Sequence, residues 1–172
     1  MALPSSNIEG LLSSIGFGVR QNNELSSGFN VRGGNFDENL IYVNGIEVYR
    51  PFLARSGQQE GLSFINPSMI ENILFSAGGF DAIYGDKLSS VLDITYREPK
   101  SFGANITTSL LGAQFQIQDK INNRLNYNVG VRYRTNAYLL GALDTKGEYK
   151  PRFTDLQGLI SYQVNEDIKL SY

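Results

Sequence analysis

The sequence contains no cysteine and no histidine, and these absences exclude several classes of chemistry. Without cysteine the chain has no disulfides, thiol nucleophiles or thiolate metal sites, and without histidine it lacks the commonest general acid–base side chain. A hydrolase would have to rely on carboxylates such as Asp37, Glu38 and Asp81, and no motif supports such a pair. We therefore expect no enzyme and no cofactor.

Charge and long apolar runs are also scarce. The net charge is −2 and the isoelectric point is near 5.2, so no clustered basic face for nucleic acid is expected. No run of about 18 apolar residues is present, which predicts no transmembrane helix. The start, Met1-Ala2-Leu3-Pro4, shows no signal peptide. The sequence therefore belongs either to a cytosolic protein or to a piece of a longer, processed chain.

The residues that are present predict a folded chain with many strands and turns. Hydrophobic residues make up 41% and charged residues 19%, and there are 18 glycines with 10 tyrosines and 10 phenylalanines. Near the N-terminus four apolar residues recur with helical spacing and predict a short helix: Ile8, Leu11, Leu12 and Ile15. We expect a strand at 17–20 and a polar loop at 21–28.

The stretch 29–49 alternates short apolar segments with glycine turns. Phe29 to Gly33 predicts a strand that ends in a Gly-Gly turn, and Leu40 to Val43 a return strand beyond a hydrophilic tip. Asn44-Gly45 predicts a tight hairpin, because both residues tolerate positive φ. A long loop follows at 50–61.

The stretch 66–101 contains a helix start and a final strand. Asn66-Pro67 predicts a capped helix start that turns into a strand at Ile73. Ser89 to Tyr96 predicts another strand, whose core face carries either Val91 or Leu92 with Ile94. Residues 97–101, which include Pro99, predict a linker.

Beyond Phe102 the sequence alternates almost strictly between apolar and polar residues. One strand has Leu125, Tyr127, Val129, Val131 and Tyr133 on one face and asparagine, glycine and arginine on the other. Residues 111–118 and 155–164 repeat this pattern, and a further strand begins at Ile168. Strands of about ten residues with alternating faces and alternately short and long connections are typical of transmembrane β-barrels. A soluble β-sandwich with one wet face fits the periodicity equally well.

Several segments resemble, in order, the plug domain of TonB-dependent outer-membrane receptors. They are Leu11–Arg20, Phe29–Gly33, Leu40–Ile46 with Asn44 where the family commonly has aspartate, Ile65–Ile73, Ser76–Gly85 and Ser89–Ile94. The resemblance covers roughly residues 3–100, and the alternating strands fall where the barrel would begin. It implies an α+β plug domain at 1–100, a small mixed sheet with short helices. Residues 101–172 would be the first antiparallel strands of an incomplete transmembrane β-barrel of about 22 strands.

The same resemblance implies a function and partners. The parent protein would gate energised uptake of a scarce nutrient, a siderophore, glycan, vitamin or peptide, across the outer membrane of a Gram-negative bacterium. Its partners would be the TonB energy-coupling complex, through a segment missing from this chain, the nutrient ligand and outer-membrane lipid. Self-association of the incomplete strands is a further hypothesis. The alternative is a soluble β-rich binding or adhesion module with no transport role.

Candidate site residues follow from this resemblance and from side-chain type. Plug loops that touch substrate in the family fall at Asn35, Phe36, Asp37 and Glu38 and at Tyr49, Arg50, Phe52 and Arg55. Arginine beside aromatic rings can stack on a ligand and pair with carboxylates, although such a loop can equally pack on its own apolar residues. Arg32 would pair with carboxylates of the barrel wall; the simpler interpretation is a solvated turn residue. Asp37 and Glu38 are adjacent acids without further ligands at calcium-loop spacing, so we expect no metal site.

Overall fold

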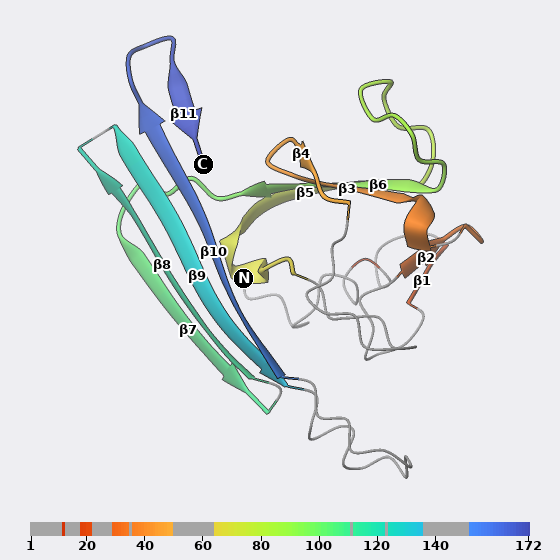
Figure 1. Cartoon of the computed structure of the whole chain (residues 1–172), viewed down its shortest axis with the longest axis horizontal. Helices are drawn as coiled ribbons and strands as arrows, with labels where there is room; N and C mark the ends of the chain where they lie inside the picture. Colours follow the sequence, from red (N-terminus) through yellow and green to blue (C-terminus); the bar gives the residue numbers. More distant parts are fainter. Residues whose placement is uncertain are drawn as a thin grey trace. The chain divides into compact units, whose positions relative to one another are not determined.

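The computed structural model describes residues 12, 18–21, 29–34, 36–49, 64–110, 112–122, 124–135 and 152–172. The chain divides into two compact units, Met1–Tyr96 and Arg97–Tyr172, and each is described by itself (Figure 1). Of the expected N-terminal helix only Leu12 is among the described residues, where it is helical and fully buried. No helix within the described ranges is long and apolar enough to cross a membrane.

Unit 1 begins with a two-stranded antiparallel sheet. Strand β1 (Val19–Gln21) pairs with β2 (Phe29–Val31). The strands predicted at 17–20 and 29–33 are thus confirmed, although β1 continues one residue further, to Gln21, and β2 ends at Val31. The prediction that Leu40–Val43 returns alongside Phe29–Gly33 is wrong, because β2 pairs with β1 instead. The expected polar tip contains a 3-10 helix, η1 (Phe36–Glu38), which redirects the chain toward a second sheet.

The second sheet of unit 1 has four strands in the order β4–β3–β6–β5. Their bounds are β3 (Asn39–Val43), β4 (Ile46–Glu47), β5 (Ile70–Ser76) and β6 (Ser90–Tyr96). Strands β3 and β6 are parallel, with Leu40 opposite Val91, although the two lie far apart in sequence. Val91, Leu92 and Ile94 are all buried, so both faces of β6 are covered, as its central position requires.

The hairpin predicted at Asn44-Gly45 is confirmed. Asn44 and Gly45 have φ values of 50° and 77°, and they join β3 to β4 with Val43 opposite Ile46. Asn44 also binds the end of β6: its backbone N–H donates to the Ile94 carbonyl at 2.8 Å, and its Oδ1 accepts from the Tyr96 N–H at 2.8 Å. Asn44 therefore combines a left-handed turn with a cap on the end of the central strand.

Substitutions at Asn44 should separate these two roles. Asn44→Ala loses the acceptor and strains the left-handed backbone, so we expect it to lower the free energy of unfolding of unit 1 by about 2–3 kcal/mol. Asn44→Gly keeps the backbone freedom and should cost about 1 kcal/mol. Asn44→Asp keeps an acceptor and should be close to the parent. Equilibrium denaturation of the three variants measures this order; equal losses for alanine and aspartate would contradict it.

The predicted helix start at Asn66-Pro67 is confirmed, but the helix is a single 3-10 turn, η2 (Pro67–Met69). The Asn66 side chain accepts a hydrogen bond from the Ser68 N–H at 3.1 Å, which is the expected cap. The chain becomes extended at Ile70, three residues earlier than predicted. The cause is the pairing of β5 with β6, which begins at Ile70 opposite Tyr96.

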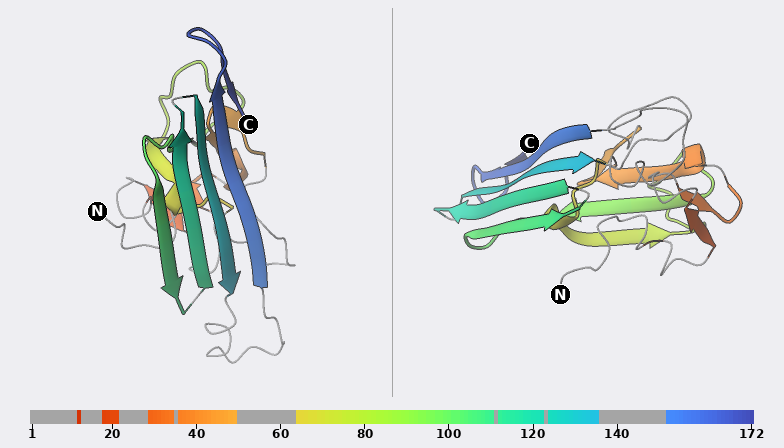
Figure 2. Two further views of the ribbon diagram at one scale, coloured as in Figure 1. Left: turned by 90° about the vertical axis from the view of Figure 1, so that its left-hand side faces the viewer. Right: turned by 90° about the horizontal axis from the view of Figure 1, so that it is seen from below.

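Unit 2 is a five-stranded antiparallel sheet in which the strands lie side by side in sequence order (Figure 2). The strands are β7 (Gly103–Ser109), β8 (Gly112–Ile121), β9 (Leu125–Thr135), β10 (Arg152–Gln163) and β11 (Lys169–Ser171). The four alternating segments noted in the sequence correspond to β8–β11, and the sheet adds β7. The central three strands have 10, 11 and 12 residues.

The two faces of this sheet have the opposite polarity to that of a protein in water, because the exposed face is apolar and the buried face is polar. The outer row is apolar and exposed: Phe115, Val131, Tyr133, Leu156, Ile160 and Tyr162. The inner row is polar and buried: Gln116, Asn128, Arg132, Asp155 and Ser161. Leu156 is 71% exposed, whereas Arg132, which pairs with the preceding residue Asp155, is 1% exposed. An exposed apolar row backed by buried polar groups is typical of a sheet whose outer face is covered by another apolar surface.

The buried polar groups of the inner row bind one another. Arg132 Nε donates to Asp155 Oδ2 at 2.9 Å, and Gln157 Nε2 donates to the other oxygen of the same carboxylate at 3.0 Å. Gln116 Nε2 donates to Asn128 Oδ1 at 2.7 Å. These contacts link β8, β9 and β10 across the polar face and offset the cost of burying the amide and charged groups.

Candidate functional site

The starts of β3 and β6 lie at the same end of the four-stranded sheet, because the two strands are parallel. The chain entering β3 and the loop entering β6 are joined there by side chains. Ser89 Oγ donates to Glu38 Oε2 at 2.7 Å, and Lys87 Nζ donates to the Asp37 carbonyl at 2.7 Å. The backbone N–H of Ser89 also donates to the Glu38 carbonyl at 3.3 Å. We call Asp37, Glu38, Lys87 and Ser89 the entry cluster.

Asn39, at the start of β3, extends the entry cluster in two directions. Its Oδ1 accepts from Ser90 Oγ at 2.7 Å, and its Nδ2 donates to the Phe29 carbonyl at 2.6 Å. Phe29 in turn packs edge-on against Phe75, with ring centroids 6.4 Å apart. The two sheets of unit 1 are therefore held together beside the candidate site by both polar and aromatic contacts.

Gly34 is closely packed against the entry cluster. A Cβ at this position would lie 1.8 Å from Ser89 Oγ and 2.8 Å from Glu38 Oε2. The absence of a side chain at Gly34 therefore allows the bond between Ser89 and Glu38 to form. This requirement was not identified in the sequence, where Gly33-Gly34 indicates only a turn.

Arg32 occupies the turn after β2 with φ of 49°, and its backbone N–H donates to the Gly18 carbonyl at 2.9 Å. Its side chain is exposed and extends toward the loop after β5, where a Cβ at Gly78 would lie 3.6 Å from Arg32 Nη1. Arg32 thus lies at an exposed turn with its guanidinium near a second loop. Its pairing with carboxylates of a barrel wall stays a prediction.

A tyrosine pair lies on one face of the four-stranded sheet. The rings of Tyr42 and Tyr84 meet edge to face with centroids 5.4 Å apart, and Tyr84 Oη donates to Asp93 Oδ2 at 2.8 Å. This hydrogen bond raises the pKa of Tyr84, with smaller contributions from burial and from the charge of the same carboxylate. The sequence placed Tyr84 only within the segment Ser76–Gly85 that resembles the plug domain; its contact with Asp93 is decided by the fold.

Tyr49 follows β4 and is 81% exposed. Its hydroxyl is hydrogen-bonded to the Glu47 carboxylate, which raises the pKa of Tyr49; Tyr42 and Asp86 add smaller effects. Because β4 runs antiparallel to β3, Tyr49 lies toward the end of the sheet that carries the entry cluster. Its exposed ring is available for stacking on a ligand.

The structure brings together part of the expected ligand-contact set. Asp37 and Glu38 lie in the entry cluster, and the backbone of Phe36 lies in η1. Asn35, Arg50, Phe52 and Arg55 lie outside the described residues. Within the described part of the chain, no group of three or more acidic residues is placed to hold a metal ion. The groups that are present offer hydrogen bonds and aromatic faces, which suit recognition.

The model of the TonB-dependent receptor plug domain matches residues 2–91, just over half of the chain. The chain belongs to the TonB-dependent receptor family. Members of this family are transporters rather than enzymes. The plug-domain fold, with its mixed sheet and short helices followed by antiparallel strands, agrees with the match.

Solved structures with a similar fold include two receptors from Pseudomonas aeruginosa. The siderophore receptor PirA is 21% identical with a TM-score of 0.62, and a mutant of the ferric enterobactin receptor PfeA in complex with enterobactin is 18% identical with a TM-score of 0.61. Both comparisons cover 95% of this chain and 29% of the other chain. The chain therefore spans less than a third of these receptors. A search of curated proteins gave no match.

The hydrogen bond between Tyr84 and Asp93 predicts a pH dependence of plug-domain stability. Its stabilising effect is complete below the ordinary tyrosine pKa of 10.0 and is lost as the pH rises through the higher pKa of the folded state. We expect the free energy of unfolding to fall in this alkaline range, and to fall less in Tyr84→Phe. Denaturant unfolding across the range measures this, with Tyr172→Phe, at a 97% exposed ring, as control. Identical pH profiles for parent and Tyr84→Phe would contradict it.

Proposed function

We propose that this chain is part of an outer-membrane receptor of a Gram-negative bacterium that gates energised uptake of a scarce nutrient. Residues 1–100 form its plug domain and residues 101–172 its first barrel strands. The plug-domain match and the fold of the solved receptors support the proposal. The observation that carries it is the inverted five-stranded sheet, because an exposed apolar row backed by a buried polar row suits a lipid-facing wall.

In this proposal the ligand binds the end of the plug domain that carries the entry cluster. Asp37, Glu38 and Tyr49 contact it together with the neighbouring loop residues Asn35, Phe36, Arg50, Phe52 and Arg55. A siderophore is one nutrient class, supported by the names of the similar receptors; a glycan, vitamin or peptide are the others. The TonB complex supplies force from the inner membrane and remodels the plug domain.

Addition of a charge to the apolar row tests whether lipid covers this face of the sheet. In lipid, Val131→Arg exposes a guanidinium to hydrocarbon and should lower the free energy of unfolding by about 2 kcal/mol. In a soluble module protein would bury this row instead, so the parent would stay folded and soluble in buffer without lipid or detergent. The measurement is equilibrium unfolding of the full-length receptor in phospholipid vesicles.

Thr107→Arg is the matched control for this charge. Thr107 is exposed and pairs with Gln114 in β8, so it lies on the polar row of the same sheet. We expect its free energy of unfolding to stay within about 0.5 kcal/mol of the parent. A parent-like stability of Val131→Arg in vesicles would refute the lipid-facing assignment, and a parent that stays soluble without lipid or detergent would favour the soluble binding module.

The location of the native protein tests the proposal independently. An antibody against residues 3–100 should detect a band several times 19.1 kDa in the outer-membrane fraction, with a mobility that changes on boiling. Folded β-barrels resist detergent because their strands leave no unpaired edge. A soluble band near 19.1 kDa would overturn the transport proposal.

A further inference from the structure

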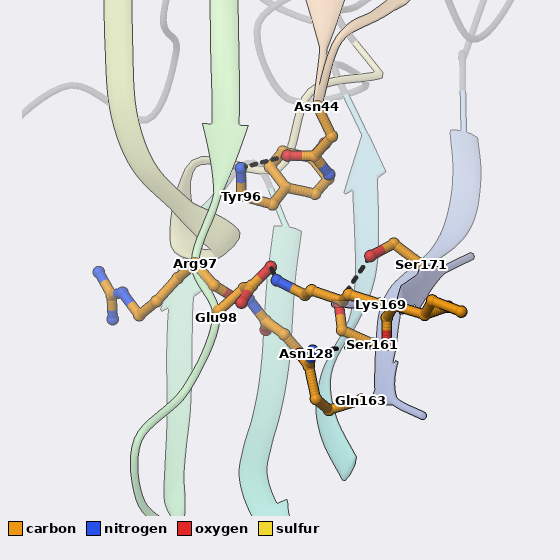
Figure 3. A network of polar contacts seen from close by, with 10 residues as sticks. Asn44, Tyr96, Arg97, Glu98, Asn128, Ser161, Gln163, Lys169 and Ser171 are labelled. Atoms are coloured by element: carbon orange, nitrogen blue, oxygen red, sulfur yellow. Dashed lines mark hydrogen bonds and ion pairs between the residues drawn. The ribbon is translucent and has the colours of Figure 1, made fainter. Parts of the chain in front are cut away.

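The linker after β6 is fixed to the sheet of unit 2 by two contacts (Figure 3). The Arg97 carbonyl accepts a hydrogen bond from Asn128 Nδ2 at 3.0 Å, and the Glu98 carboxylate forms an ion pair with Lys169 Nζ. The next residue, Pro99, is buried. We call Arg97, Glu98, Asn128 and Lys169 the linker clasp.

The linker clasp takes its two sheet residues from strands that are not neighbours in the sheet. Asn128 lies in β9 and Lys169 in β11, with β10 between them. Asn128 is fully buried, and its Oδ1 accepts a hydrogen bond from Gln116 Nε2 at 2.7 Å. This contact fixes the orientation of the amide that donates to the linker. Lys169 pairs in register with Gln163, and nearby Ser161 and Ser171 share a hydrogen bond of 3.1 Å. The linker therefore spans the polar row from β9 to β11.

The residue on the other side of the junction is fixed within unit 1. The backbone N–H of Tyr96 donates to Asn44 Oδ1, the contact that caps β6 (Figure 3). Tyr96 is thus hydrogen-bonded within unit 1, and the next two residues, Arg97 and Glu98, are held within unit 2. The connection between Tyr96 and Arg97 is the point at which the attachments change from one unit to the other.

We propose that the linker clasp is a fixed anchor, and that residues 97–99 stay docked on the sheet when the preceding unit is rearranged. The buried amide of Asn128 gives the clasp its position. The ion pair is about 40% exposed on each side, at 41% for Glu98 and 39% for Lys169, so salt screens it. The rearrangement of the plug domain rests on the function proposed above, whereas the docking of the linker does not.

Trypsin provides a direct measure of docking, because Arg97 and Lys100 are cleavage sites inside the linker. Cleavage requires local release of the chain. In the full-length receptor in detergent, we expect slow cleavage at both bonds and a rate about 10-fold higher in the Asn128→Ala/Lys169→Gln double variant. Controls are Lys120→Gln and Glu166→Gln, which should cleave like the parent. An unchanged rate in the double variant would overturn the proposal.

A milder variant covers the case in which loss of Asn128 disturbs the sheet. Glu98→Gln removes only the exposed ion pair and should raise the cleavage rate about 2- to 5-fold. High salt should raise the rate in the parent but not in Glu98→Gln, because the Debye length falls to about 3 Å at 1 M. Equal salt responses of the two proteins would contradict the role of the ion pair.

A covalent lock tests whether the anchor stays docked during uptake. A receptor carrying Glu98→Cys and Lys169→Cys, joined by a short bismaleimide, should take up nutrient at the rate of its uncross-linked form. Loss of uptake only after cross-linking would overturn the fixed anchor. Absence of uptake in every form would contradict the proposed function, and the cleavage rates would still decide the docking.

Discussion

Asp155→Ala is expected to lower the free energy of unfolding of the receptor by about 3–5 kcal/mol. Arg132 Nε lies 2.9 Å from Asp155 Oδ2, and the two side chains are only 2% and 7% exposed. Without the carboxylate, a buried guanidinium would lose its charged partner, and Gln157 would lose the acceptor of its amide. The measurement is urea unfolding of the full-length receptor in detergent micelles.

Two further variants define the cause of this loss. Glu166→Ala removes an exposed acid from the connection between β10 and β11 and should change stability by less than about 0.5 kcal/mol. The double variant Arg132→Met/Asp155→Leu removes both charges and should cost less than Asp155→Ala alone, because no charge is left buried. A double variant at least as unstable as Asp155→Ala would show that the pair itself, rather than the unpaired charge, determines the loss.

Gly112→Ala is expected to cost about 2–5 kcal/mol by distorting the start of β8. Gly112 has φ of +145°, a value that side chains rarely permit. A Cβ there would also lie 2.0 Å from the Tyr133 carbonyl oxygen and 3.0 Å from Arg134 Cα, both parts of the β9 backbone. Since backbone cannot rotate away as a flexible side chain does, the strand pairing itself must shift.

Gly158 in β10 offers a matched control for this substitution. A Cβ at Gly158 would lie 3.7 Å from Val129 Cγ2, which is ordinary van der Waals contact. We therefore expect Gly158→Ala to remain within about 0.5 kcal/mol of the parent. Thermal unfolding of the two variants under the same conditions makes the comparison. Similar losses at the two glycines would indicate a general intolerance of alanine in these strands and contradict the steric account.

Short-range features of the fold could be predicted from the sequence because their causes are local. Asn44-Gly45 can adopt positive φ on its own, and the cap at Asn66 needs only the Ser68 N–H two residues away. The alternation along β9 likewise follows from the period of an extended chain. It determined which residues share a face, and it left open whether water or lipid covers that face.

Pairing between distant segments could not be predicted in the same way. The return strand expected after Phe29–Gly33 is hydrogen-bonded to β6 and β4 instead, because its apolar residues are buried beside Val91 and Leu92. The hydrogen bond between Ser89 and Glu38 in the entry cluster could not be predicted for the same reason. The two residues are 51 positions apart, and the residues around each give no sign that the other is its partner.

The sequence by itself determined most of the strands and turns, with β7 as the exception, the division of faces in the C-terminal part and the resemblance to a receptor plug domain. The tertiary structure decided which strands are neighbours, which polar groups become buried partners, and where the linker is fixed. The physical reason is that turn and strand preferences act over a few residues. The pairing of Arg132 with Asp155 and of Glu98 with Lys169 depends on the packing of strands far apart in the chain.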